Sequence, residues 1–214
     1  MSLKSRLIVG ISGGSGAIYG VRLLQVLKPL PVETHLVMSK AAEMTLAYET
    51  EFKAKDVRAL ADRWYPLTDL GAAISSGSFQ TLGMIVAPCS VRSMAEIATG
   101  VTSNLLTRAA DVVLKERRRL VLMLRESPLH TGHLRNLTAL SEMGAIIAPP
   151  LPAFYTRPQS VAEIVDHSVG RVLDLMGIES GLVKRWGEAP PRPRRPVKPH
   201  PGERPATAKP KKPR

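Results

Sequence analysis

The chain has 214 residues, of which 44% are hydrophobic, a formal net charge of +12, and one cysteine, Cys89. This length suits one domain with a sizeable core, and a single cysteine excludes an internal disulfide framework and a CxxC metal site. Because the sequence has no secretory signal and no run of about 18 apolar residues, we expect a cytoplasmic protein without a transmembrane helix.

The positive charge is concentrated near the C-terminus. The 28 residues from Gly187 contain nine Lys or Arg against two Glu, and nine prolines, so they carry +7 and the body carries +5. Such a segment cannot bury enough apolar surface to offset the entropy of ordering. We therefore predict a folded domain at 1–186 and a disordered basic tail at 187–214. The tail could contact nucleic acid, but a solvated appendage without a specific partner is the commoner case.

The first elements predict a site for an anion. Leu7–Ile11 has the character of a strand, Ser12–Gly16 is a glycine-rich loop, and 17–27 has helical spacing. This order presents backbone N–H groups and a helix N-terminus to an anion, although a tight turn without a ligand stays open. The next strand, 34–38, ends in Ser39 instead of the Asp or Glu typical of NAD enzymes, which favours a mononucleotide.

Strands and helices alternate through the rest of the chain. We predict helices over 41–51, 56–65, 91–98, 105–116, 130–143 and 160–176, strands over 84–87, 120–124 and 144–148, and a polar loop at 75–78. The run Leu120–Leu124 is apolar on both faces, as in a buried parallel strand, although a helix core can mimic it. The alternation predicts a single doubly wound α/β domain, Rossmann-like (flavodoxin-like), with a mostly parallel sheet.

Charged residues follow the run 120–124 directly. In open α/β sheets, ligands bind beyond the carboxyl ends of the strands, where Arg125 and Glu126 are expected. Arg108 and Lys115, seven residues apart, lie on one face of the preceding helix. The cations suggest that the ligand is a phosphate ester, and the single carboxyl group suggests a residue that transfers a proton.

Other polar residues have ordinary interpretations beside functional ones. Ser90 and Ser93 stand at a second strand-to-helix junction, where hydroxyls more often cap the helix than hold a phosphate. Cys89 is expected to be a packed small side chain. His130 and His133 could share a metal, but no third ligand is evident, so we interpret them as helix-start residues and predict no metal site.

Several long motifs, in the same order, resemble those of the UbiX flavin prenyltransferases: GISGGSGAIYG, HLVMSKAA, SSGSFQTLGMIVAPCS, LLTRAADVVLKERRRLVLMLRESPLHTGHL, PAFYTRPQS and a closing RW. The resemblance covers about residues 5–186. It implies a metal-independent transfer of a dimethylallyl group from dimethylallyl monophosphate to N5 and C6 of reduced FMN. The implied product is prenylated FMN, the cofactor of UbiD-type decarboxylases. A homo-oligomer with sites at subunit interfaces is also implied.

The resemblance assigns roles to three groups of residues. FMN would be held by Gly13, Gly14, Ser15, Ser39, Ser90, Val91, Arg92, Ser93 and Arg125. The prenyl phosphate would be bound by Tyr155, Arg171, Arg108 and Lys115. The catalytic set would be Ser15, Glu49, Glu126 and Lys115.

Two departures from the family pattern are visible, and two other functions stay open. Gly14 replaces the usual alanine, and Ser103 stands where relatives often carry aspartate. An FMN-dependent cysteine decarboxylase of the same fold would need an active-site histidine and a PASANT-like loop. Here that loop reads PCSVRS, and no histidine lies between His35 and His130. A non-catalytic flavin carrier or assembly factor would have no need of the retained carboxylates and cations.

Overall fold

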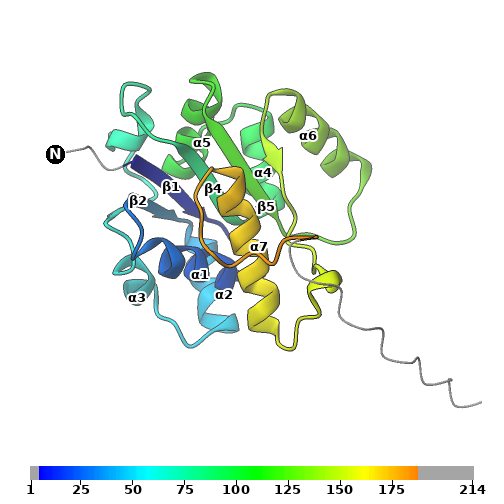
Figure 1. Cartoon of the computed structure of the whole chain (residues 1–214). Coiled ribbons are helices and arrows are strands. Elements are labelled where there is room, and N and C mark those ends of the chain that lie inside the picture. The colour runs from blue at the N-terminus through cyan, green and yellow to red at the C-terminus, as the bar shows by residue number, and fades with distance from the viewer. Residues whose placement is uncertain (1–4, 188–214) are drawn as a thin grey trace, which may run out of the picture. The chain divides into compact units, whose positions relative to one another are not determined.

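A six-stranded parallel sheet lies at the centre of the computed structural model, which describes residues 5–187 (Figure 1). Its strands are β1 (Ser5–Ile11), β2 (Val32–Met38), β3 (Arg63–Tyr65), β4 (Gly83–Cys89), β5 (Arg119–Leu124) and β6 (Ile146–Ile147). They are ordered β3-β2-β1-β4-β5-β6, and every neighbouring pair is parallel. This is the doubly wound Rossmann order, in which the winding reverses between β1 and β4. The predicted fold class is confirmed.

Helices cover both faces of the sheet. They are α1 (Ala17–Leu27), α2 (Lys40–Glu49), α3 (Ala54–Arg58), α4 (Val91–Ala98), α5 (Leu105–Lys115), α6 (Thr131–Glu142) and α7 (Val161–Leu175), with 3-10 turns η1 (Ala73–Ser75) and η2 (Phe154–Thr156). Apolar residues of α1, α2, α3 and α7 form one core with the sheet, and those of α4, α5 and α6 form the other. The elements predicted over 17–27 and 91–98 have the predicted bounds.

The strand predicted over Leu120–Leu124 is confirmed as the buried strand β5. Val121 and Met123 belong to the α1/α7 core, whereas Leu120 and Leu122 belong to the α5/α6 core. Successive side chains of a strand point to opposite faces, so a strand covered on both sides must be apolar throughout. The unbroken apolar run is therefore a consequence of the two helical layers.

The helix predicted over 56–65 is wrong beyond Arg58. The chain turns at Asp62, whose carboxylate accepts hydrogen bonds from the Thr34 N–H at 2.8 Å and the Thr34 hydroxyl at 2.9 Å. The next three residues, Arg63–Tyr65, then pair with β2 as an edge strand. This pairing is non-local, and two aromatic residues favour it. The predicted loop at 75–78 begins inside η1, and the strand predicted over 144–148 is confined to β6.

One compact unit ends at Lys184, and Arg185 belongs to a second unit. Within that second unit, Trp186 and Gly187 lie in a turn. The predicted domain boundary at 186 stays a prediction, and the tail from 188 onward lies outside the described residues. None of the helices described in 5–187 is long and apolar enough to cross a membrane.

Gly20 provides a test of the packing between α1 and the sheet. A Cβ at this position would overlap the carbonyl oxygen of Ala87 and lie 2.7 Å from Cδ1 of Ile11. Because a backbone oxygen cannot move aside as a flexible side chain can, Gly20→Ala should lower the free energy of unfolding by about 1–3 kcal/mol. Urea denaturation would measure the change. The matched control is Gly71→Ala, whose Cβ would meet only Asp69 Oδ1 at 3.6 Å. Equal stabilities of the two variants would contradict the close contact.

Candidate flavin and phosphate site

Ser12 ties together the carboxyl ends of the two central strands. It directly follows β1 and is buried, with 1% of its surface exposed. Its hydroxyl donates to the carbonyl oxygen of Pro88 at 2.9 Å and accepts from the N–H of Ser90 at 2.7 Å. The loops after β1 and β4 are thereby held side by side at the point where the winding reverses. Ligands of doubly wound folds bind in this crevice.

The glycine loop lies in the same crevice. A Cβ on Gly13 would overlap the side chain of Ala41, so only glycine allows this approach to the start of α2. A Cβ on Gly14 would lie 3.4 Å from the carbonyl oxygen of Cys89 and 3.5 Å from Cβ of Arg125. These are ordinary contact distances, so an alanine at this position would also fit. The loop thus lies between the ends of β4 and β5 and the start of α2.

Ser15, Glu49 and Arg125 meet beside the N-terminus of α1. The Glu49 carboxylate accepts hydrogen bonds from the N–H groups of Gly16 at 2.8 Å and Ala17 at 3.0 Å, and it is also bonded to the Ser15 hydroxyl. Arg125 Nε donates to the carbonyl oxygen of Ser15 at 3.1 Å. Three residues that are far apart in sequence are therefore brought together. Glu49, unremarkable in the sequence by itself, occupies a site for a carboxylate at a helix N-terminus.

The hydrogen bonds decide the ionisation of Glu49. Burial raises the pKa of Glu49, but the Ser15 hydroxyl, the N–H groups of Gly16 and Ala17 and the charge of Arg125 together outweigh it. The net result is a pKa below the ordinary value, because each of these groups stabilises the charged form. Glu49 is therefore a carboxylate at neutral pH.

Two further helices begin at this edge with serine caps. The Ser39 hydroxyl accepts from the N–H of Ala42 at 3.0 Å, and the Ser90 hydroxyl accepts from the N–H of Ser93 at 3.3 Å. Capping, the commoner role for Ser90, is confirmed. The starts of α1, α2 and α4 concentrate backbone donors and partial positive charge in one crevice, as an anionic phosphate group requires. With Arg125 and the glycine cradle, this donor set fits FMN.

Arg92 is not brought into the crevice. Its side chain is 83% exposed, and its Nε forms an ion pair with Glu96 at 2.9 Å, one turn along α4. Val91, half-buried at the first position of α4, lies beside the capped junction. The assignment of Arg92 to the flavin-binding junction stays a prediction, although its guanidinium points to Glu96 in this structure. Only its backbone, between Ser90 and Ser93, lies at the predicted place.

A cavity of about 330 Å³ lies between the ends of β5 and β6 and one side of α7. It brings together Tyr155 and Arg171, the residues predicted to bind the prenyl phosphate. His167, which the sequence reasoning missed, also lines it, and its Nε2 lies 3.2 Å from the Tyr155 hydroxyl. The available signal was its spacing of four residues before Arg171, which places both on one face of a helix.

The carboxyl group of Glu126 lies at the end of β5, as predicted. Glu126 is exposed, and its carboxylate accepts a hydrogen bond from the N–H of Ser127 at 3.1 Å. It follows Arg125 directly and therefore lies at the same mouth of the sheet as the flavin loop. Its single backbone bond leaves carboxylate oxygen available to a ligand.

Lys115 and Arg108 do not join this site within one subunit. Lys115 ends α5 where β4 and β5 begin, and its Nζ is bonded to Glu116 at 2.5 Å. β5 then runs six residues, about 20 Å at 3.3 Å per residue, before Glu126 is reached. Arg108 forms an ion pair with Asp111 at 3.0 Å on α5. One subunit does not bring these cations to the cavity of Tyr155. The prediction that they bind the same phosphate was made together with sites at subunit interfaces, and it stays a prediction.

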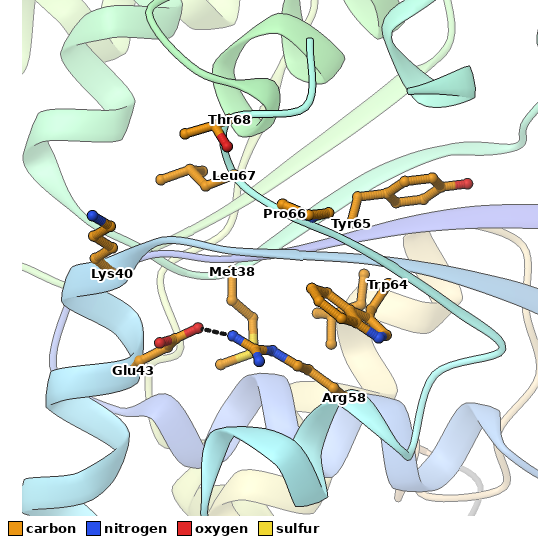
Figure 2. A pocket seen from close by; sticks show the side chains of 10 residues that line it. Met38, Lys40, Glu43, Arg58, Trp64, Tyr65, Pro66, Leu67 and Thr68 are labelled. Atoms are coloured by element: carbon orange, nitrogen blue, oxygen red, sulfur yellow. Dashed lines mark hydrogen bonds and ion pairs between the residues drawn. The ribbon is translucent and has the colours of Figure 1, made fainter. Parts of the chain in front are cut away.

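A second cavity, of about 270 Å³, lies at the ends of β2 and β3 (Figure 2). Met38 and Lys40 line it and flank Ser39, but none of the predicted site residues does. Its rim is closed on one side by Arg58, which forms an ion pair with Glu43 and lies 4.6 Å from the centre of the Trp64 ring. This cavity neighbours the flavin crevice and is separate from it.

Cysteine and histidine have structural roles outside these cavities. Cys89 is fully buried, and burial raises the pKa of its thiol to about 12, so it is not a nucleophile at neutral pH. The Nδ1 atom of His130 accepts from the N–H of Gly132 at 3.0 Å and caps α6, as expected for a helix-start residue. Among residues 5–187, no group of three or more His, Cys, Asp or Glu is arranged to hold a metal ion.

The fold and the crevice define a doubly wound protein with a mononucleotide site of the flavoprotein kind, and residues 1–176 match the family described as Flavoprotein. The flavin prenyltransferase UbiX of Escherichia coli K12 is 59% identical over 184 residues, which is 85% of this chain and 97% of that protein. The chain therefore belongs to the UbiX family of flavin prenyltransferases.

Solved structures agree with this assignment. AnUbiX (PadA1), crystallised with FMN and dimethylallyl pyrophosphate, is 48% identical and matches with a TM-score of 0.86 over 88% of this chain and all of that one. A dodecameric FMN-dependent UbiX-like decarboxylase of Escherichia coli O157:H7 is 55% identical and matches with a TM-score of 0.83 over 85% of this chain and 98% of that one.

The capping of α1 by Glu49 predicts a pH-dependent stability. The pKa of Glu49 is lower in the folded protein than in the unfolded chain, where it is near 4.5. The stabilisation of the fold by Glu49 is therefore fully present above pH 4.5, and it is lost as the pH falls through the lower pKa of the folded state. Glu49→Gln should therefore destabilise the protein at pH 7 by about 0.3–1 kcal/mol and by less toward pH 3–4. Chemical denaturation across this range would measure the difference. Glu51→Gln, two residues away on the surface, is the control, and an identical pH profile for both variants would contradict the cap.

Proposed function

We propose that the chain transfers a dimethylallyl group from dimethylallyl monophosphate to reduced FMN. The observation that carries this proposal is the adjacency of the two sites along β5. Met123 lines the cavity of Tyr155 and Arg171, and Arg125, two residues on, contacts the flavin loop. Two residues of a strand span about 7 Å, so a phosphate ester in the cavity and a flavin in the crevice would touch.

Bound reduced FMN supplies the electron-rich atoms, N5 and C6, that accept the dimethylallyl group. The chain holds the flavin through Arg125, the loop from Gly13 to Ser15 and the capped starts of α2 and α4. The crevice donates backbone N–H groups at fixed positions, so binding requires little reorganisation. Its walls are the ends of parallel strands, which are rigid parts of the fold.

Fixed cations assist departure of the phosphate. Breaking the allylic C–O bond leaves its electron pair on the phosphate oxygen, and the guanidinium of Arg171 with the Tyr155 hydroxyl stabilises the charge that develops there. We assign the proton for this oxygen to Glu126, at the mouth of the sheet. The chain contains no Asp-Asp-x-x-Asp motif, the usual magnesium-diphosphate clamp, so we propose that cationic side chains replace the metal.

Glu49 and Glu126 have different tasks because their surroundings differ. Glu49 accepts hydrogen bonds from two backbone N–H groups and the Ser15 hydroxyl, so it holds the Ser15 proton and fixes the direction of the Ser15 oxygen. It is suited to accept a proton from the flavin edge through Ser15. Glu126 has one backbone donor and open solvent. We propose that Glu49, through Ser15, acts as the base and that Glu126, at the mouth of the sheet, supplies the proton.

Lys115 and Arg108 complete the phosphate site only if a second copy of the chain presents them. A relative from Escherichia coli O157:H7 is dodecameric. We propose a homo-oligomer in which Lys115 of one copy reaches the Tyr155–Arg171 cavity of another. We further propose that prenylated FMN passes to a UbiD-type decarboxylase, and we keep the cytoplasmic location predicted from the sequence.

The alternative functions use less of the site. A cysteine decarboxylase would need a histidine at the flavin. Of the histidines described near this edge of the sheet, His167 lines the cavity of Tyr155 and Arg171, and His130 caps α6 with His133 stacked on it. A flavin carrier would need the crevice but neither the cavity nor Glu126. The presence of a cavity that fits a phosphate ester, beside the flavin crevice, therefore favours a catalytic function over a flavin carrier.

Incubation of the protein with reduced FMN and dimethylallyl monophosphate, without oxygen, should give a flavin heavier by one dimethylallyl unit. Mass spectrometry of the released flavin would detect it. Glu126→Gln should retain FMN binding and lower turnover by about 100-fold or more, because the proton donor is lost. The matched control is Glu142→Gln, an exposed carboxyl group at the end of α6. Unmodified FMN from the wild-type protein would refute the proposed function.

Mixed oligomers test the shared site. Lys115→Ala and Glu126→Gln should each be nearly inactive alone, because each removes one charged group from every site. Co-assembled, they should recover part of the wild-type rate, since some sites would combine an intact Lys115 from one copy with an intact Glu126 from another. Initial rates across mixing ratios would measure this. Rates that never exceed the weighted mean of the parents would place both residues in the same copy.

A further inference from the structure

The cavity at the ends of β2 and β3 has a wall suited to a flat ring. Leu36 and Met38 of β2 line it and are buried, and Trp64 of β3, paired with Leu36, lines it with 48% of its surface exposed. Pockets that hold drug-sized ligands measure about 300–1,000 Å³. At about 270 Å³, this cavity is therefore large enough for one ring system and a few attached atoms.

The charged side chains of this cavity favour an anionic ligand. Its lining contains two cations, Lys40 and Arg58, and one carboxylate, Glu43, so it carries one net positive charge. Glu43 and Arg58 neutralise each other in an ion pair, and the guanidinium of Arg58 lies 4.6 Å from the centre of the Trp64 ring (Figure 2). The unbalanced charge is therefore that of Lys40, at the first position of α2. The cavity thus combines an exposed aromatic ring with a lysine ammonium group.

One residue, Ser39, separates this cavity from the flavin crevice along the chain. Met38 and Lys40, on either side of it, line the cavity. The N–H of Ser39 donates to the carbonyl oxygen of Ile11 at 3.0 Å, and Ile11 is the last residue before the glycine loop. In doubly wound folds that bind a dinucleotide, the ribose of the adenosine lies at the end of this second strand. The cavity therefore occupies the place that such folds give to an adenosine.

The direction of the bound flavin follows from the proposed function. Its isoalloxazine ring must lie toward β5, beside the cavity of Met123 and Arg171, to receive the dimethylallyl group. Its phosphate must then lie toward β1 and β2, where the glycine loop and the capped start of α2 present backbone N–H groups. A group attached to that phosphate would pass Ser39 and reach Lys40 and Trp64.

We infer that the cavity of Lys40 and Trp64 binds the adenosine monophosphate part of FAD, so that the chain takes FAD as well as FMN. The inference rests on the proposed function for the direction of the flavin. FAD is FMN joined through a pyrophosphate to adenosine monophosphate, and its adenine is a flat aromatic ring. Adenine stacks on aromatic side chains and on the guanidinium plane of arginine, which Trp64 and Arg58 supply. The ammonium group of Lys40 attracts the pyrophosphate.

The residues at the end of β2 distinguish FAD from NAD. In NAD enzymes, a carboxylate at this strand end binds the ribose hydroxyl. This chain has Ser39 and Lys40 there, and Glu43, the one carboxylate that lines the cavity, is neutralised by Arg58. The chain therefore lacks the contact to the NAD ribose and has a cation for a phosphate group instead.

Competition between oxidised flavins would test the inference without turnover. The full-length protein, loaded with FMN, is dialysed against equal concentrations of FMN and FAD, and the bound flavins are separated by chromatography after denaturation. FAD should exceed FMN in the bound fraction about three- to tenfold, because adenine stacking outweighs the cost of ordering the added groups. A bound fraction in which FMN exceeds FAD would overturn the inference.

Variants of the cavity locate the adenine. Trp64→Ala should lower the ratio of bound FAD to bound FMN about tenfold, whereas Trp64→Phe, which keeps a ring, should lower it about twofold or less. Lys40→Gln should lower the ratio about threefold, and Lys40→Arg should keep it, because a cation is retained. The matched control is Tyr48→Ala, which removes an aromatic side chain that is 87% exposed on α2, outside the cavity.

The ratio compares two flavins in the same sample, so a fraction of unfolded protein does not change it. A ratio that is the same in the wild type and in Trp64→Ala would place the adenine outside the cavity and overturn the inference.

Failure of the proposed function would look different, because no allyl donor is present in the competition. If the wild-type protein makes no prenylated FMN but selects FAD through Trp64, the assignment of the cavity stands and the proposed function fails. If the wild type prenylates FMN and excludes FAD, the proposed function stands and the assignment of the cavity is wrong.

Discussion

The buried hydroxyl of Ser12 is the interaction on which the rest of the site depends. It bridges the carbonyl oxygen of Pro88 and the N–H of Ser90, and so joins the ends of β1 and β4 where the winding of the sheet reverses. Helices from the two strands diverge to opposite faces at this point, and a crevice necessarily opens between their starts. Without the hydroxyl, the N–H of Ser90 would lose this partner, and the two loops would be joined here only by the backbone bond from the Ser12 N–H to the Pro88 carbonyl oxygen at 3.1 Å. With it, the loops are held as fixed walls for a ligand.

The charge pattern of the crevice follows from its position. Parallel strands all deliver helix N-termini to the same edge, so the partial positive charges of α1, α2 and α4 gather there. The chain uses one of these with its own carboxylate, Glu49, and leaves the serine-capped starts of α2 and α4 for an external anion. The same positive field explains why Glu49 is ionised although it is partly withdrawn from water. One constraint of topology therefore accounts both for the gathering of backbone donors at this edge and for the ionised carboxylate of Glu49.

Local pattern predicted much of the fold because most elements are buried in a regular way. The apolar run of β5 and the amphipathic pattern of α7 follow from the helical layers on both faces of the sheet, so both can be recognised in the sequence. The edge strand Arg63–Tyr65 has no such pattern in the sequence, because its pairing with β2 depends on the contact between Asp62 and Thr34, which are far apart along the chain. The same difference holds for the cavity beside α7. Family motifs predicted Tyr155 and Arg171, whereas His167 was recognised only in the structure, which places its ring beside Tyr155.

The position of Lys115 connects this architecture to assembly. A helix that returns antiparallel to the strands begins near the functional edge and must end at the opposite one, so a cation in its last turn is about one strand length from its own flavin crevice. No rotamer of lysine covers about 20 Å, because its side chain is four carbons long. If Lys115 serves catalysis, the site must be built from at least two copies, and the interface must bring opposite edges of two sheets together. Arg108, which is half-buried, and Lys115, which is exposed, would then belong to an interface and to the phosphate site at once, and oligomerisation would have a direct chemical role.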